Sequence, residues 1–373
     1  MILKKIEYSE HGDTPHYWEI RDVEFGQLNL IVGLNATGKT LLLKAISKLA
    51  SFMSPNLDLI RLIKDGRWKA QFYDKTEDFI VTYELEKSDD IVKTENITSN
   101  RAFSSIRNNG EVKISLDNNA EFVERLRWSS QSSLYSLRDP ILYPIPEKLI
   151  DWAAGYQQYR FDDINQFREY YAKDKMENRS APLIIPLLIK LLNNDVIKEK
   201  LTEDFNYIGY PIDDISIDQV KRLQFTENTV EVSVKEKGLE CLTKYYAMSQ
   251  GMFRALTLIV IIEDLLLSNS ECTLVIDDIG EGLDFDRSSK LIKLIFSKLK
   301  DSNIQFIATT NNRFLINAVD IRDLNILERE GHVVKSYNYS NSKEQFDEFE
   351  FTGLGSFDLF RYQMYKTQEA QVE

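Results

Sequence analysis

Apolar positions at the start of the chain follow strand periodicity and then change to helical periodicity. Residues 2–8 and 17–23 alternate between apolar and polar side chains, and 28–32 is a mostly apolar run, as expected for a buried strand. Over 40–50 the apolar residues recur at the spacing of one helix face. The beginning of the chain therefore predicts strands, a glycine-containing loop and a helix.

The middle of the chain is less regular. Residues 67–86 predict a β-hairpin around the turn signal DKTED. Between about 87 and 240 a polar stretch rich in Asn and Ser is followed by segments with helical periodicity. The predicted helices cover 145–155, 161–176 and 182–203. No sustained heptad pattern is present, which rules out a long coiled-coil arm.

Strands and helices alternate in the last third of the chain. The predicted order is a helix over 254–267, a strand over 273–276, a helix over 287–300, a strand over 305–309, a helix or turn over 313–319, and strands over 324–327 and 333–339. Such alternation is typical of a largely parallel sheet covered on both faces.

We therefore predict an α/β fold with a mixed, largely parallel sheet, an antiparallel β lobe and an inserted helical lobe. The core is expected to combine 1–86 and 240–345, with 87–239 as an inserted helical and irregular lobe and 346–373 as a C-terminal tail.

Composition bounds the class of protein. With 373 residues and 43% hydrophobic content, the chain can bury one large core or two smaller ones. No run approaches the roughly 18 apolar residues of a membrane helix, and the start has no signal-peptide pattern. Cys241 and Cys272 lie far apart without metal-ligand spacing. They predict reduced thiols in a cytoplasmic protein rather than a disulfide. The lack of a long apolar run predicts that the protein has no membrane partner.

The net charge of −13 disfavours binding nucleic acid with the whole surface, because phosphate binding needs clustered cations. A nucleic-acid partner is compatible with the sequence but finds no support in this charge. A thin local basic group is formed by Arg101, Arg107, Lys113, Arg125 and Arg127. A solvated surface of mixed charge is the simpler interpretation.

The segment GLNATGKT over 33–40 matches the phosphate-binding pattern G-x-x-x-x-G-K-[ST] between a buried strand and a helix. In such a loop, backbone N–H groups cradle phosphates, Lys39 reaches the β- and γ-phosphates, and the Thr40 hydroxyl coordinates Mg²⁺. ATP and Mg²⁺ are therefore the predicted cofactors. The predicted nucleotide-binding residues here are Gly33, Leu34, Asn35, Ala36, Thr37, Gly38, Lys39 and Thr40.

A second motif ends the apolar strand over 273–276, where two carboxylates follow, Asp277 and Asp278. A parallel strand delivers such residues to the carboxyl edge of the sheet, where ligands bind. Asp277 is expected to hold Mg²⁺, directly or through water, and Asp278 to orient the attacking water. The alternative is a helix cap or a solvated turn, and the upstream phosphate loop favours the functional interpretation.

A third motif, AMSQGMFR over 247–254, contains Ser-x-Gly-x-x-Arg in front of an apolar helix, which by itself is a common cap. Together with the phosphate loop, the acidic strand end and the GLD over 282–284, it resembles the ABC ATPase superfamily. Within that superfamily, MSQGMFR resembles the SMC, RecF and OLD-like ATPases of DNA repair and phage defence more than transporter subunits. The resemblance covers about the first 50 residues and 240–335.

The resemblance implies an ABC ATPase head whose nucleotide sites form when two subunits pair head to tail. Ser249 and Gly251, with Gln250 between them, would contact the γ-phosphate held by the phosphate loop of the other subunit. The D-loop over 282–284 would cross the interface. The implied partner is thus a second copy of the chain, in a dimer or a higher homo-oligomer.

Two catalytic positions depart from the family pattern. Asp278 stands where the family usually has Glu, and Asn311 where it has a switch His. Asp is one methylene shorter, and a misplacement near 1 Å can cost about a hundredfold in rate. Asn cannot exchange a proton near neutral pH, although it can donate a hydrogen bond to a phosphate. Slow hydrolysis is the expectation, with Glu281 as an alternative carboxylate.

Two further roles follow from the resemblance. The metal-contacting glutamine of the Q-loop should follow the hairpin lobe, and Gln131 is the candidate. Tyr17 or Trp18 would stack on adenine, with core packing as the alternative.

The function that these motifs favour is a nucleotide-gated switch controlling a separately encoded effector, in anti-phage defence by family analogy. After 339 about 30 residues remain, too few for a nuclease or Toprim domain. The alternative is a RecF- or SMC-like repair ATPase that binds DNA across the paired heads. A transporter subunit is disfavoured by the roughly 200 residues between Thr40 and Ser249.

Overall fold

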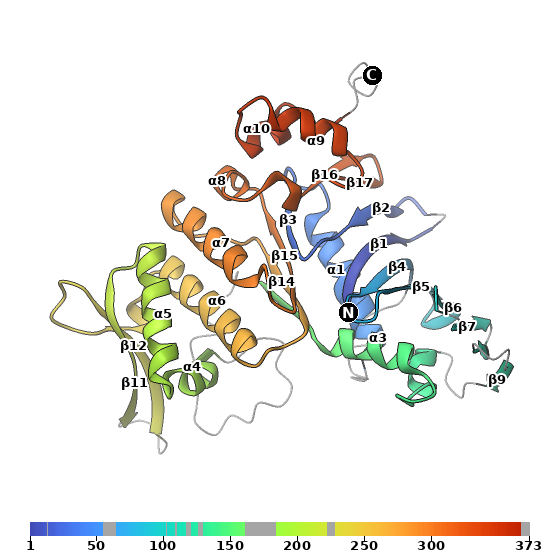
Figure 1. Ribbon diagram of the computed structural model, residues 1–373, viewed down its shortest axis with the longest axis horizontal. Helices are drawn as coiled ribbons and strands as arrows, with labels where there is room; N and C mark the ends of the chain where they lie inside the picture. Colours follow the sequence, from blue (N-terminus) through green and yellow to red (C-terminus); the bar gives the residue numbers. More distant parts are fainter. Residues whose placement is uncertain are drawn as a thin grey trace.

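The computed structural model describes residues 1–12, 14–54, 65–101, 103–108, 110–116, 121–125, 130–160, 184–221 and 228–366. The helix predicted over 161–176 and the predicted surface cation Arg127 lie outside these ranges. Figure 1 shows a sheet through the middle of the molecule, with helices on both sides and a strand-rich lobe at one end.

Within the described residues, one continuous sheet of 14 strands crosses the whole molecule. In spatial order its strands are β10 (Tyr156–Arg160), β14 (Cys272–Asp277), β15 (Ile304–Thr310), β3 (Leu28–Val32), β16 (Leu324–Glu330), β17 (Val333–Asn338), β2 (Trp18–Glu24), β1 (Ile2–Glu10), β4 (Gly66–Asp74), β5 (Phe79–Ser88), β6 (Ile91–Ser99), β7 (Ser104–Asn108), β8 (Glu111–Ser115) and β9 (Glu121–Arg125).

Helices cover this sheet from both sides. The first side carries α1 (Lys39–Met53) and α3 (Pro144–Ala154), and the second carries α4 (Ile184–Leu192), α5 (Asp195–Ile208), α6 (Gln250–Leu267), α7 (Phe285–Leu299), α8 (Arg313–Ile316), α9 (Lys343–Glu350) and α10 (Ser356–Arg361). A separate three-stranded sheet, β11 (Ile212–Lys221), β12 (Asn228–Glu236) and β13 (Thr243–Lys244), lies beside α5.

Alternation along the central strands gives the molecule two cores. In β14 the side chains of Leu274 and Ile276 join the core under α6 and α7, whereas Val275 joins the core under α1. Successive strand residues point to opposite faces, so a strand buried on both sides must be apolar throughout. This is why the acidic residues of the second motif appear only where β14 ends.

The α/β fold is confirmed, and parallel pairing surrounds the phosphate loop. Strands β10, β14, β15, β3 and β16 pair in parallel, while nearly all remaining pairs are antiparallel. The sheet is therefore mixed as predicted, parallel around the phosphate loop and antiparallel in the β lobe. The predicted hairpin over 67–86 is present as β4 and β5.

The predicted division of the chain differs from the structure in two places. The boundary at 86 falls inside a continuous sheet, because β6 to β9 extend the hairpin lobe. Val92 and Ile114 are buried in these strands, but so are the polar Glu95 and Arg107, whereas Ile106 is exposed, so the apolar pattern is interrupted. The predicted tail begins inside α9, where Phe346 and Phe349 join the main core.

Candidate functional site

The loop between β3 and α1 is tightly packed and needs glycine at two positions. A Cβ on Gly33 would lie 2.5 Å from Oγ1 of Thr37, and one on Gly38 would lie 2.9 Å from Cγ2 of Val334. Ala36 (φ 64°) and Gly38 (φ 103°) adopt left-handed conformations that turn the chain into α1. The loop therefore directs main-chain N–H groups and the helix N-terminus toward one concavity, which suits an anion.

Lys39 supplies the cation of this loop. Its ammonium group donates hydrogen bonds to the carbonyl oxygens of Gly33 (2.8 Å) and Leu34 (3.0 Å). Burial lowers the pKa of Lys39, while the nearby carboxylates of Asp278 and Asp277 act to raise it. The side chain is thus folded over the loop, where a phosphate would sit.

The ends of β14 and β15 bring the acidic pair to α1. Oδ2 of Asp277 lies 3.5 Å from Oγ1 of Thr40, the first-turn hydroxyl of α1. Oδ1 of Asp277 accepts a 2.6 Å hydrogen bond from Thr309, whose hydroxyl in turn accepts a 2.8 Å bond from the N–H of Asp278. Thr309, for which the sequence carries no motif, thus holds the carboxylate of Asp277 and the main chain of Asp278.

Asp278 follows the last residue of β14 in a left-handed conformation (φ 52°), which Asp tolerates better than most residues. The turn aims its side chain at the surface of the pocket beside Lys39. Burial raises its pKa, and the charge of Asp277 raises it further, while Lys39 opposes this shift. A carboxylate with a raised pKa in a polar pocket has the chemistry of a general base.

Lys39, Thr40 and Asp278 line one pocket of about 330 Å³. Its lining consists of Trp18, Asn35, Ala36, Gly38, Lys39, Thr40, Leu41, Asp278, Asn311 and Arg329. Asn311 Nδ2 donates a 3.1 Å hydrogen bond to Oδ1 of Asn35, so the predicted switch position lies against the phosphate loop. Residues far apart in sequence are therefore brought together as the motifs suggested.

One end of the pocket is lined by the aromatic ring of Trp18. The guanidinium of Arg329, on β16, lies 4.2 Å from the ring centroid of Trp18, at the start of β2. Tyr17 points elsewhere, since its hydroxyl donates to Glu19 and the residue does not line the pocket. Of the two aromatic candidates, Trp18 is the one placed to stack on a base.

The Ser-x-Gly motif lies outside this pocket. Ser249 caps α6, its Oγ accepting from the N–H of Met252 (3.2 Å), and both Ser249 and Gln250 are exposed. Gly251 packs so closely on the D-loop that a Cβ there would lie 2.5 Å from the carbonyl of Gly282. The motif and the D-loop thus form one surface within the subunit.

Arg254 joins these two segments. Its buried guanidinium donates to the carbonyl of Glu281 and lies 3.4 Å from the Glu281 carboxylate. A second hollow of about 280 Å³ follows the D-loop and shares Asp278 and Asn311 with the first pocket. Glu281 remains mostly exposed beside it.

Gln131 is not brought to this site. Its carbonyl accepts from Arg107 inside the β lobe, and it is absent from the described residues that line the pocket. The strand that reaches the carboxyl edge beside β14 is β10, which ends at Arg160. Nε of Arg160 lies 3.9 Å from Oδ2 of Asp277. The metal-contacting role predicted for Gln131 is therefore wrong. The chain runs on past residue 131 to β10, and it is β10 that lies beside the acidic strand end.

The residues present fit ATP and Mg²⁺. Gly33 and Gly38 let the loop pack against Thr37 and Val334 in the turn that opens α1, and Lys39 supplies the cation. Thr40 and Asp277 offer the oxygen donors that Mg²⁺ prefers, with its remaining positions open to phosphates and water. In the described part of the chain no group of three or more His, Cys, Asp or Glu could hold a metal by itself.

The described members of the predicted basic group do not form a patch of unpaired positive charge. Arg107 is fully buried and pairs with Glu95 (3.3 Å), while Arg101 pairs with Glu77 (2.6 Å) and Arg125 with Glu111 (3.3 Å).

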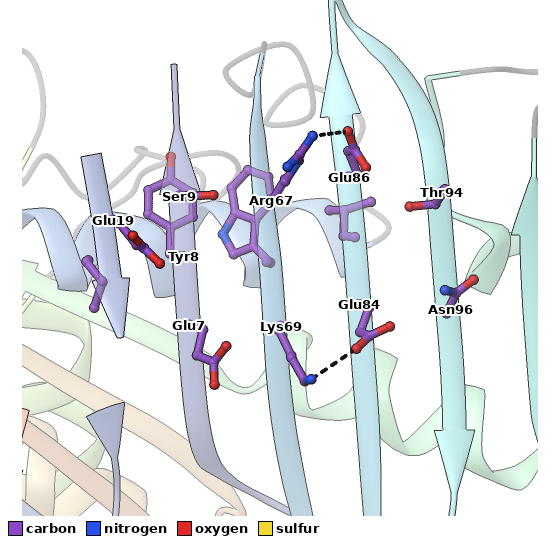
Figure 2. Close-up of a pocket in the computed structure, with 13 residues that line it drawn as sticks. Glu7, Tyr8, Ser9, Glu19, Arg67, Lys69, Glu84, Glu86, Thr94 and Asn96 are labelled. Atoms are coloured by element: carbon purple, nitrogen blue, oxygen red, sulfur yellow. Dashed lines mark hydrogen bonds and ion pairs between the residues drawn. The ribbon is translucent and has the colours of Figure 1, made fainter. Parts of the chain in front are cut away.

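Figure 2 shows a pocket of about 270 Å³ on the open face of the β lobe. Cross-strand pairs Arg67–Glu86 (2.9 Å) and Lys69–Glu84 (3.4 Å) line it, beside Glu7 and Glu19. Arg101, Arg107 and Arg125 in the first group, and Arg67 and Lys69 in this pocket, each pair with a carboxylate. No helix in the described ranges is long and apolar enough to cross a membrane.

Comparison with known proteins identifies the family and the fold of the chain. A family model described as "AAA domain, putative AbiEii toxin, Type IV TA system" matches residues 28–317. Among curated proteins, no sequence matches the chain.

Among solved structures, the SMC head bound to the C-winged helix domain of ScpA is 15% identical, with 90% of this chain and 97% of that chain covered at a TM-score of 0.52. The SMC head with an extended coiled coil, bound to the C-terminal domain of ScpA from Pyrococcus furiosus, is 13% identical, with 94% and 100% covered at a TM-score of 0.50. These likenesses establish the fold. The chain belongs to the AAA-domain family that its sequence matches, and it has the fold of an SMC ATPase head.

Proposed function

We propose that the chain is a slowly hydrolysing ATPase whose heads pair head to tail in a nucleotide-gated switch. The observation that carries this proposal is the shared pocket of Lys39, Thr40, Asp278 and Asn311, with the capping Ser249 exposed outside it. The pocket has the parts that hold a nucleoside triphosphate, and it has no cation other than its own Lys39 and Arg329 among the described lining residues.

The chain's residues divide the chemistry between them. Mg²⁺ bound at Asp277 and Thr40 would neutralise charge on the β- and γ-phosphates. Lys39 binds the same phosphates, and Asp278 accepts the proton of the attacking water. Asp278 is short for this task, and Asn311 donates a hydrogen bond without exchanging a proton. Slow turnover is the consequence, so that the bound state persists.

Pairing would complete each site. A second subunit is proposed to present Ser249, Gln250 and Gly251 to the γ-phosphate held at Lys39. Exposed apolar side chains near the site support the proposal that a second subunit covers this surface. Leu34 in the phosphate loop is 68% exposed, and Phe285, after the D-loop, is 57% exposed. Such residues are common at the buried centre of interfaces.

We propose that a separately encoded effector reads the paired state, in anti-phage defence and in the cytoplasm. The support is by analogy. The matched family is described as a toxin of type IV toxin–antitoxin systems, and the SMC heads are bound to domains of a separate protein, ScpA.

The alternative is a repair ATPase that binds DNA across its paired heads. Phosphate binding would need cations that carboxylates do not already neutralise. On the open face of the β lobe, Arg67 and Lys69 are paired with glutamates. This face therefore favours the switch over the DNA-binding alternative.

The test is the mass of the protein in solution with and without Mg-ATP, measured by size-exclusion chromatography with light scattering. Asp278→Asn should bind ATP and accumulate as pairs, because hydrolysis no longer releases them. Ser249→Arg should bind ATP and remain single. ATP-driven pairing of Ser249→Arg that equals the wild type would contradict the head-to-tail arrangement.

A further inference from the structure

The strand next to the acidic motif ends in an arginine. Among the described strands, β10 lies at the edge of the sheet and pairs in parallel with β14, in a register that sets Arg160 opposite Asp277. Both residues end their strands, so both lie at the carboxyl edge of the sheet, on the side of the phosphate loop. The backbone thus fixes an arginine beside the carboxylate that would hold the metal.

The two side chains meet at a particular oxygen. Nε of Arg160 lies 3.9 Å from Oδ2 of Asp277, and the same Oδ2 lies 3.5 Å from the hydroxyl of Thr40. The other oxygen, Oδ1, is already engaged by Thr309 at 2.6 Å. The guanidinium therefore approaches the oxygen that faces the expected metal position.

A guanidinium and a divalent cation compete for such an oxygen. Arg is a permanent cation and has no lone pair to offer a metal, so it cannot take part in coordination. Asp277 is almost completely buried, and a buried carboxylate needs a counter-charge. Arg160 supplies part of that charge, together with Lys39, from a side chain that is half exposed.

We propose that Arg160 is a counter-ion of Asp277 and that Mg²⁺ displaces it from Oδ2. This competition would raise the Mg²⁺ concentration that nucleotide binding requires. The inference deepens the proposed function and rests on it. Two opposite effects follow from removing the arginine. Mg²⁺ gains a carboxylate without a competitor, whereas metal-free ATP loses a cation that offsets the repulsion from Asp277 and Asp278.

The experiment measures binding of a fluorescent ATP analogue to wild type, Arg160→Ala and Arg160→Gln. One titration varies Mg²⁺ at fixed nucleotide, and another varies nucleotide in EDTA. Arg361→Ala, an arginine on α10 far along the chain from the site motifs, is the matched control. Unfolding curves without ligand establish that each variant is folded.

Both Arg160 variants should need about two- to fivefold less Mg²⁺ for half-maximal binding, the range expected for a partly exposed ion pair. Their affinity for metal-free nucleotide should fall by a similar factor. A Mg²⁺ requirement that is unchanged or higher, while wild type binds Mg-nucleotide normally, overturns this inference alone. A wild type that binds no nucleotide under either condition overturns the proposed function, and this inference with it.

Discussion

The hydroxyl of Thr309 donates a 2.6 Å hydrogen bond to Oδ1 of Asp277. The same hydroxyl accepts the N–H of Asp278 at 2.8 Å. One side chain on β15 thus fixes the rotamer of the first carboxylate and the main chain of the second. It leaves Oδ2 of Asp277 directed at Thr40. Thr309 is accordingly a positioning residue for the metal site.

Thr309→Val keeps the shape of the side chain but removes both hydrogen bonds. We expect a loss of about 1–3 kcal/mol in the free energy of unfolding, because a buried carboxylate oxygen loses its donor. The Mg²⁺ requirement for nucleotide binding should rise roughly tenfold, which corresponds to about 1.4 kcal/mol. Thr310→Val is the control, since its hydroxyl contacts the main chain of Ile279 and Asn312. Equal shifts in Mg²⁺ requirement for both variants would show that Thr309 acts only on stability.

ATP should stabilise the folded wild type. A ligand present at a hundred times its dissociation constant adds about 2.7 kcal/mol to unfolding. Lys39→Ala should lose this stabilisation, because the loop then has no cation for the β- and γ-phosphates. Differential scanning fluorimetry with millimolar Mg-ATP measures the effect. A wild-type melting temperature unmoved by ATP would contradict the nucleotide assignment.

The pH profile of hydrolysis should report Asp278. Because burial and Asp277 raise the pKa of Asp278, the acid limb should lie above the 3.8 of an ordinary Asp. The base must be ionised, so activity is lost as pH falls through this raised pKa. Above that pH the ionised Asp278 costs stability, because the folded state holds the proton more tightly than the unfolded state. Asp278→Asn should therefore remove most turnover without lowering the stability of the unliganded protein at neutral pH.

Asp278→Glu tests whether reach limits the rate. Phosphate release at matched ATP occupancy should rise in this variant, and the paired state should be shorter-lived. Equal rates for Asp278→Asn and wild type would move the base elsewhere, with Glu281 the next carboxylate along the chain.

Trp18→Ala should weaken ATP binding about fivefold or more, as stacking of a base on an aromatic ring contributes about 1–3 kcal/mol. Binding of inorganic tripolyphosphate, which has no base, should change little. Tyr17→Ala is the matched control, because Tyr17 does not line the pocket. An equal loss of affinity for ATP and tripolyphosphate would show that Trp18 supports the loop rather than the base.

The sequence predicted the parts of the fold whose signal is local. The strand before Gly33, the helix after it and the strand before Asp277 each follow from a run of apolar residues with one period. The strands β6 to β9 carry a weak signal because buried polar residues such as Glu95 and Arg107, and exposed apolar ones such as Ile106, interrupt the alternation. Their pairing is long-range and depends on the neighbouring hairpin rather than on their own composition.

The site residues that belong to a sequence motif could be predicted. Those that are brought to the site by the pairing of strands could not. Lys39 and Asp277 lie in recognisable patterns, whereas Arg160 reaches Asp277 only because β10 pairs with β14. Gln131 was chosen for its position after the hairpin lobe, but the chain continues through α3 before it returns to the sheet. Thr309 has no signal beyond ending an apolar strand.

The central claim, that each nucleotide site is shared by two subunits, is tested most directly by mixing two inactive variants. Lys39→Ala retains Ser249, and Ser249→Arg retains Lys39, so a mixed pair contains one intact composite site. Each variant alone should release little phosphate, because neither forms ATP-driven pairs with itself. An equal mixture should recover activity, up to about half of the wild-type rate, because a mixed pair has one intact site of two. A mixture no more active than its components, or a Ser249→Arg protein as active alone as the wild type, would contradict the account.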